Sequence, residues 1–199
     1  MLLPGGDLWR CGSCGFVFRF PLLAAETYAA LYRTGNLDVW DIEEQREDFR
    51  LVRDKLSVLD GQKLKVLDFG CYTGQLLKSL SKSFELFGVE PNVRAAQIAE
   101  QRGIKIVSQD AGKIENLDDR YDIIVTCDVI EHVPNPLDLL KQLRSRLKPG
   151  GLLLVSTGNC DAWLWRLTRA RFWYCQFPEH ISFIGNRWLK KMPSLAGLE

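Results

Sequence analysis

The chain has 199 residues, which suits one domain of moderate size with some additional elements. Hydrophobic residues make up 46% and charged residues 26%, a balance typical of a globular protein with an apolar core. The formal net charge of +1 argues against nucleic acid as a partner, because nucleic-acid-binding domains are usually strongly basic. No apolar run approaches the roughly 20 residues that span a bilayer, and the first residues lack the charged and apolar regions of a signal peptide.

The six cysteines do not form the pattern of a disulfide-bonded protein. Only Cys11 and Cys14 lie at short spacing, and the other four are scattered along the chain. We therefore expect free thiols and a cytoplasmic location, where the environment is reducing.

Residues 1–20 resemble part of a zinc ribbon. Cys11 and Cys14 form a Cys-x-x-Cys-Gly knuckle, followed by the alternating apolar residues of a strand. Tetrahedral structural zinc normally takes two such pairs, and none of the ten residues before Cys11 is Cys or His. No metal site is therefore expected within this chain: the two thiols stay free, or ligands supplied from elsewhere complete the site.

Residues 21–60 are expected to connect this knuckle to the rest of the chain. Residues 21–40 are interpreted as a loosely structured connector with several aromatic side chains. Residues 41–59 show the spacing of an amphipathic helix, which Gly61 ends. This helix is expected to form a lid on the site or to cover a sheet.

Residues 61–199 alternate between short apolar runs and helical patterns. The predicted strands are residues 65–69, 85–90, 104–107, 121–126 and 152–156. The predicted helices are residues 75–82, 91–101, 138–147 and 188–195. Strands without polar alternation that are separated by helices indicate an α/β fold with a parallel sheet covered on both faces.

Two predicted strands end in acids, and the loop after the first contains glycines. Asp68 precedes Gly70 and Gly74, and Glu90 ends the second strand. Glycines allow backbone N–H groups to approach a ligand, and an acid at the second strand can accept hydrogen bonds from a ribose diol. Tyr72 breaks the Gly-x-Gly-x-x-Gly fingerprint of dinucleotide binders. The Asp68 carboxylate would repel a pyrophosphate and suits a cationic group, such as the amino group of a methionine moiety.

Five segments, in order, resemble the motifs of class I S-adenosylmethionine-dependent methyltransferases. They read Val-Leu-Asp-Phe-Gly-Cys-Tyr-Thr-Gly, Gly-Val-Glu-Pro-Asn, Asp-Ala, Tyr-Asp-Ile-Ile-Val-Thr-Cys-Asp-Val-Ile-Glu-His-Val-Pro-Asn-Pro, and Leu-Lys-Pro-Gly-Gly-Leu-Leu-Leu-Val-Ser-Thr. They cover roughly residues 62–157. The resemblance is greatest to bacterial methyltransferases with an N-terminal zinc ribbon, many of which act on sugars or small metabolites. It implies a Rossmann-like, doubly wound parallel sheet of about five strands in the order 3-2-1-4-5.

The resemblance also implies which residues bind S-adenosylmethionine. Asp68, Gly70 and Gly74 would line its methionine and ribose parts, and Cys71 belongs to the same loop. Tyr72 departs from the glycine most common in the family, and its side chain either points away or partly caps the pocket.

The later motifs would complete the cofactor site. Glu90 would bind the ribose hydroxyls, with Pro91 and Asn92 beside the adenine. Asp110 would meet the adenine amino group, and Ala111 would offer backbone contacts. The remaining expected positions are Cys127 and Asp128, which would flank the sulfonium, and Val129 to His132, which would line the opening toward the acceptor.

The two histidines, His132 and His180, are the candidate catalytic bases. Each stands beside a predicted site loop, and a hydroxyl acceptor could lose its proton to either. The alternatives remain that His132 only caps a helix start and that His180 is an ordinary loop residue.

Residues 160–195 are expected to cover the acceptor. Their Trp- and Arg-rich part also fits an interfacial segment at a membrane surface, and the first interpretation is preferred. The family fold continues with an antiparallel strand pair that this chain lacks, so we expect a partial family member whose open sheet edge allows self-association. The predicted function is methyl transfer to a small polar acceptor, and the alternative is a cofactor-binding module with little or no turnover.

Overall fold

The computed structural model describes residues 7–34, 46–112, 114, 117 and 119–198. These residues form two compact units through which the chain passes more than once. We call the first the hairpin unit (Met1–Tyr28, Asp128–Arg144 and Thr157–Glu199) and the second the sheet unit (Ala29–Cys127 and Ser145–Ser156). No helix among the described residues is long and apolar enough to cross a membrane.

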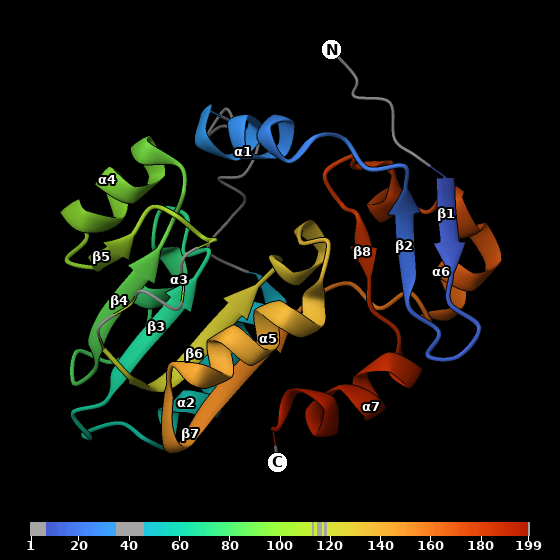
Figure 1. Cartoon of the computed structure of the whole chain (residues 1–199). Coiled ribbons are helices and arrows are strands. Elements are labelled where there is room, and N and C mark those ends of the chain that lie inside the picture. Colours follow the sequence, from blue (N-terminus) through green and yellow to red (C-terminus); the bar gives the residue numbers. More distant parts are fainter. Residues whose placement is uncertain (1–6, 35–45, 113, 115–116, 118, 199) are drawn as a thin grey trace. The chain divides into compact units, whose positions relative to one another are not determined.

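The sheet unit contains five parallel strands in the order β5-β4-β3-β6-β7 (Figure 1). Their bounds are Lys65–Phe69 for β3, Glu85–Val89 for β4, Lys105–Ser108 for β5, Tyr121–Cys127 for β6 and Leu147–Ser156 for β7. Numbered within the sheet, this is the predicted order 3-2-1-4-5. The strand ends that carry Asp68 and Glu90 are therefore neighbours, because β3 and β4 are paired in parallel.

Three helices of the sheet unit pack on these strands: α2 (Glu47–Ser57), α3 (Gln75–Lys78) and α4 (Val93–Gln101). Val52 and Leu56 of α2 lie in one core cluster with Val66 of β3, so α2 covers the sheet. Residues 41–45 of the expected helix lie outside the described residues. Helix α4 begins at Val93, slightly later than the predicted residue 91, because the side chain of Asn92 accepts hydrogen bonds from two backbone N–H groups of its first turn.

The predicted end of α3 and the predicted start of β7 were wrong by several residues. Helix α3 ends at Lys78 instead of residue 82, since the hydroxyl of Ser79 donates back to the carbonyl of Leu76. Strand β7 begins at Leu147, several residues before the predicted 152, and its pairing with β6 shifts register between Tyr121 and Ile123. Helix α5 accordingly spans Pro136–Ser145.

The hairpin unit contains a small antiparallel sheet with the order β1-β2-β8. Strands β1 (Asp7–Arg10) and β2 (Val17–Phe20) form a hairpin, and β8 (Ser182–Phe183) pairs with β2. The other elements are α6 (Trp163–Thr168), α7 (Asn186–Ala196) and the 3-10 helices η3 (Ile130–His132), η4 (Arg169–Arg171) and η5 (Trp173–Gln176). An aromatic core that includes Trp165, Tyr174 and Phe183 joins β8 to α6 and η5.

The segment expected to be a loosely structured connector is helical over Ala25–Thr34, which forms α1. Its four alanines at and next to the first turns favour a helix strongly. Tyr28 is buried, with 8% of its surface exposed. The aromatic residues suggested a connector, whereas alanine propensity determined the local structure.

Candidate active site

The loop after β3 directs its backbone N–H groups inward. The N–H groups of Gly70 and Cys71 both donate to the carbonyl of Val89, at 2.9 and 3.1 Å. The N–H of Tyr72 donates to the Glu90 carboxylate at 2.8 Å. These three N–H groups therefore have hydrogen-bond partners within the chain. A loop whose donors are already used is a poor phosphate cradle, which agrees with the absence of the dinucleotide fingerprint.

The glycines of this region serve close packing. Gly74 has φ +75°, and a Cβ there would lie 2.0 Å from Cδ1 of Ile104 and 3.3 Å from Cβ of Ala99. Gly88 of β4 leaves room for the side chain of Cys71, whose sulfur would lie 2.5 Å from an added Cβ. Cys71 is thus a buried core residue, and burial raises the pKa of its thiol. Any contact of Cys71 with a cofactor would have to use its backbone.

The backbone conformation at Tyr72 explains why glycine is the most common residue of the family at this position. Its φ is +49°, in the left-handed region that side chains other than glycine rarely adopt. The residue is half-buried. The departure from the family pattern noted in the sequence is therefore a point of backbone strain in the loop.

Asp68 and Glu90 bring two acids together in a buried place. Only 4% of Asp68 and 6% of Glu90 is exposed. The two Glu90 oxygens accept hydrogen bonds from the N–H groups of Tyr72 and Asn92, each at 2.8 Å. Burial, reinforced by the charge of Glu90, raises the pKa of Asp68 to about 7. Burial also raises the pKa of Glu90, against the effect of its two backbone donors.

This pair of carboxylates suits S-adenosylmethionine better than a dinucleotide. Carboxylate oxygens at these strand ends would attract the ammonium and sulfonium of that cofactor and could accept hydrogen bonds from ribose hydroxyls, whereas they would repel a pyrophosphate. Arg46, just before α2, is a positive charge that acts on Asp68 and opposes the rise of its pKa. The sequence did not indicate Arg46 as a residue of this region.

The remaining expected cofactor residues of the sheet unit lie at neighbouring strand ends. Pro91 follows Glu90 just after the end of β4, and Cys127 is the last residue of β6. Asp110 is exposed in the loop after β5, where its carboxylate accepts a hydrogen bond from the N–H of Gly112 at 2.9 Å. Ala111 belongs to the same loop.

The hairpin unit contains Asp128, which is expected to flank the sulfonium, and Val129, where the expected opening toward the acceptor begins. Asp128 has φ +51°, and its side chain hydrogen-bonds with that of Glu131. Both Asp128 and Val129 are half-buried. The 3-10 helix η3 follows directly and carries His132.

His132 and His180 lie together although they are far apart in the sequence. Their ring centroids are 4.8 Å apart, with the rings at 70°. Nδ1 of His132 is 3.1 Å from the carbonyl oxygen of Glu179, and Nδ1 of His180 is 2.9 Å from that of Tyr174. A carbonyl can only accept, so each Nδ1 carries the hydrogen and each neutral ring has its lone pair on Nε2. Burial lowers the pKa of His132 to about 4, and burial together with His132 lowers that of His180 to about 3.

Glu131 is the buried acid of this cluster, and the sequence did not single it out. Its side chain is fully buried, and burial raises its pKa. It accepts hydrogen bonds from the hydroxyls of Tyr174 and, at 2.9 Å, Thr157. The Tyr174 oxygen in turn accepts the N–H of Gly158 at 3.1 Å. The acid that follows two apolar residues in Val-Ile-Glu-His was the available sequence signal.

Arg19 is a further residue that the sequence did not indicate. It lies in β2 with 7% of its surface exposed. Its guanidinium donates to three backbone carbonyls of the segment that carries His180: Cys175 at 2.8 Å, His180 at 3.1 Å and Phe177 at 3.4 Å. A charge within the apolar alternation Val-Phe-Arg-Phe was the available signal. The hairpin is therefore a support for the histidine segment.

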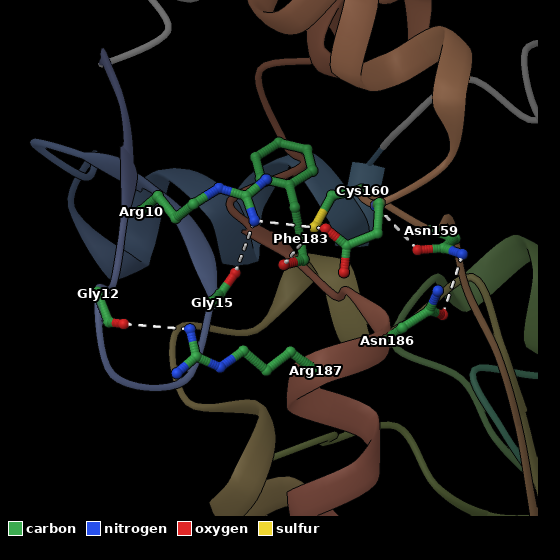
Figure 2. A network of polar contacts seen from close by, with 9 residues as sticks. Arg10, Gly12, Gly15, Asn159, Cys160, Phe183, Asn186 and Arg187 are labelled. Atoms are coloured by element: carbon green, nitrogen blue, oxygen red, sulfur yellow. Dashed lines mark hydrogen bonds and ion pairs between the residues drawn. The ribbon is translucent and has the colours of Figure 1, made fainter.

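The turn that carries Cys11 and Cys14 joins β1 to β2 and is bound to other parts of the hairpin unit (Figure 2). Arg187 of α7 donates to the carbonyl of Gly12 at 3.3 Å, and Arg10 pairs with Asp161 at 3.4 Å. All six cysteines of the chain are free thiols in the structure. Hydrogen bonding from Ser13 lowers the pKa of Cys11 to about 6.

Comparison with known proteins identifies the family. Residues 42–199 match the family described as methyltransferase domain. The chain belongs to this family. It is also 33% identical over 157 residues to a ubiquinone biosynthesis O-methyltransferase of Bradyrhizobium diazoefficiens, a match that covers 72% of this chain and 61% of that protein. Over other proteins of the same name the matched share falls to 43%, so the chain spans about half the length of these curated relatives.

Solved structures show the same fold. A methyltransferase from Thermotoga maritima, described as a possible histamine N-methyltransferase, is 25% identical with a TM-score of 0.58, over 76% of this chain and 73% of that one. The magnesium protoporphyrin IX methyltransferase of Synechocystis, solved with bound SAH, is 18% identical with a TM-score of 0.64, over 87% and 89%. The predicted Rossmann-like class is confirmed. Methyltransferases of this family use S-adenosylmethionine, so the predicted cofactor is confirmed as well.

Proposed function

We propose that the chain transfers the methyl group of S-adenosylmethionine to a hydroxyl oxygen of a small polar acceptor, a sugar or another metabolite. The observation that carries this proposal is the pair of neutral imidazoles, His132 and His180, beside the buried acid Glu131. Proteins similar to this chain are named O-methyltransferases, which supports oxygen as the atom that receives the methyl group.

The sheet unit is proposed to hold the cofactor. Asp68 would attract its cationic methionine end, and Glu90 would accept hydrogen bonds from its ribose hydroxyls. The other residues proposed to line the cofactor are Gly70, Cys71, Tyr72, Gly74, Pro91, Asp110, Ala111, Cys127, Asp128 and Val129. Methyl transfer from a sulfonium is an in-line displacement, so positioning of donor and acceptor supplies most of the rate acceleration.

The hairpin unit is proposed to bind the acceptor. Either His132 or His180 would take the hydroxyl proton on Nε2. Their low pKa values keep the rings unprotonated far into the acid range, but they also make the rings weak bases. The proposal therefore favours acceptors whose hydroxyl is acidic or is activated by another group.

Calorimetry with S-adenosylmethionine and with NAD is the first test of this function. We expect binding of S-adenosylmethionine only, because Asp68 repels a pyrophosphate. Single-turnover methyl transfer to a panel of phenolic and sugar hydroxyls then identifies the acceptor class, and the His132→Ala and His180→Ala variants test the base. Unchanged rates in both variants would remove the histidines from the mechanism. Cofactor binding without transfer to any acceptor would favour the alternative of a binding module with little turnover.

Three finer proposals accompany this function. The Cys11–Cys14 turn supports membership of the zinc-ribbon subgroup, which zinc analysis of the purified chain tests. The free thiols support a reducing cytoplasm as the compartment. Strand β7 lies at one edge of its sheet, which supports self-association there, and size-exclusion chromatography over a range of concentrations tests it.

A further inference from the structure

Glu131, His132 and His180 form a group with the composition of a metal site. One potential ligand atom from each residue lies within 4.8 Å of the other two. Within the described part of the chain, this is the one group of three or more such side chains gathered closely enough to hold an ion. It also contains both histidines of the sequence.

Each of the three side chains is held in place by a second partner. The imidazoles donate from Nδ1 to the carbonyls of Glu179 and Tyr174, which leaves the lone pair of each ring on Nε2. The carboxylate of Glu131 accepts one hydroxyl on each oxygen and also hydrogen-bonds with the side chain of Asp128, which leaves about one of its four acceptor positions for an ion. Metal-ligating histidines are characteristically oriented in this way, by donating their other ring N–H to a carbonyl.

We propose that Glu131, His132 and His180 bind one divalent transition-metal ion through a carboxylate oxygen and the two Nε2 atoms. Two imidazoles with one carboxylate suit zinc, cobalt or manganese, whereas magnesium and calcium prefer oxygen ligands alone. An ion at about 2.1 Å from each ligand requires ligand atoms about 3.4 Å apart. The three groups would thus draw closer on binding.

A bound ion would change how the acceptor hydroxyl is activated. With both Nε2 atoms on the ion, neither ring could take the acceptor proton, and the ion would polarise a bound hydroxyl instead. Ion binding itself does not depend on the proposed methyl transfer.

The experiment must separate this site from the Cys11–Cys14 thiols, which also bind soft ions. We therefore use the full chain with Cys11→Ser and Cys14→Ser and titrate it with Zn²⁺ in a calorimeter. We expect one ion per chain. Co²⁺ should give an absorption spectrum of nitrogen and oxygen ligands without a thiolate charge-transfer band.

Substitutions in the same background identify the ligands. His180→Gln and, separately, Glu131→Gln should weaken Zn²⁺ binding by about 100-fold or more, since each removes one ligand. Glu100→Gln, an exposed acid of α4, is the matched control and should bind as the parent does. Zn²⁺ should raise the Tm of the parent and of the control but not of the two site variants.

Folding is checked by the Tm of each variant without metal. Absence of Zn²⁺ binding to the doubly substituted parent would overturn the proposal. Binding that survives in well-folded His180→Gln and Glu131→Gln would overturn it equally. Neither result bears on whether S-adenosylmethionine binds, which the calorimetry described under the proposed function measures separately.

Discussion

Burial shifts the pKa values of ionisable groups in opposite directions in the two units. In the sheet unit, burial raises the pKa values of the two acids Asp68 and Glu90, and the charge of Glu90 adds to the rise at Asp68. In the hairpin unit, His132 and His180 are two bases whose burial lowers theirs. The first pair carries negative charge that a cationic ligand would neutralise, and the second pair is neutral. The comparison teaches that burial sets the direction of each pKa shift, upward for the acids and downward for the histidines. The charge that results in each unit indicates the kind of ligand that suits it.

The same contrast predicts opposite contributions to stability as the pH changes. Asp68 titrates at 3.8 when unfolded and at about 7 when folded, so its folded form holds the extra proton, and stability falls as pH rises through that window. The histidines titrate at 6.5 when unfolded and at about 4 and about 3 when folded, so stability is lost as pH falls below 6.5.

Asp68→Asn tests the sheet unit and has the largest expected effect on cofactor affinity. Removing this carboxylate should weaken S-adenosylmethionine binding by about 100-fold, because a cationic partner loses its counter-charge. It should also stabilise the free protein at pH 8 by about 2 kcal/mol, because one of two repelling buried charges is gone. Calorimetry and urea unfolding measure the two effects. Glu85→Gln, an exposed acid on β4, is the control, and a variant destabilised at pH 8 would contradict the proposed charge balance.

Arg19→Met tests the hairpin unit. It removes the donors to the carbonyls of Cys175, Phe177 and His180, and we expect a loss of about 3 kcal/mol in the free energy of unfolding. Hydrogen exchange should rise most in residues 175–183, while S-adenosylmethionine affinity stays near that of the parent. The exposed Arg171→Met is the matched control. A large loss of cofactor affinity with unchanged hydrogen exchange would show that Arg19 does not act through this segment.

Tyr72→Gly has the smallest expected effect. Glycine relieves the left-handed strain at this position, whereas Tyr72→Ala removes the same ring and keeps the strain. The glycine variant should therefore be more stable than the alanine variant by about 1 kcal/mol. Thermal unfolding of both measures this difference, and equal Tm values would mean that the loop is not strained at Tyr72.

The sequence predicted the sheet unit well, because its signals are local. The acids Asp68 and Glu90 and the helix start near Asn92 follow from short motifs and spacing, whereas the strand order follows from the resemblance to class I methyltransferases. The role of Cys71 was beyond such reasoning, since the space for its side chain is created by Gly88 on another strand.

The hairpin unit was less predictable, because its contacts join distant segments. Both histidines were identified as candidates, but their mutual contact depends on packing between η3 and the residues before β8. Glu131 and Tyr174 meet only in the folded chain, and Arg19 binds carbonyls that any sequence would provide. Helix α1 was not predicted although its signal is local, because the aromatic residues of this segment suggested a connector and obscured the helix propensity of its alanines.

The pairing of β2 with β8 has a consequence for how the protein folds during its synthesis. Val17 and Phe18 are synthesised well before their partners Phe183 and Ser182. The β2 edge of the β1–β2 hairpin therefore stays unpaired until β8 has been made. The sheet unit needs only residues up to Ser156, so it can form before β8 pairs with β2.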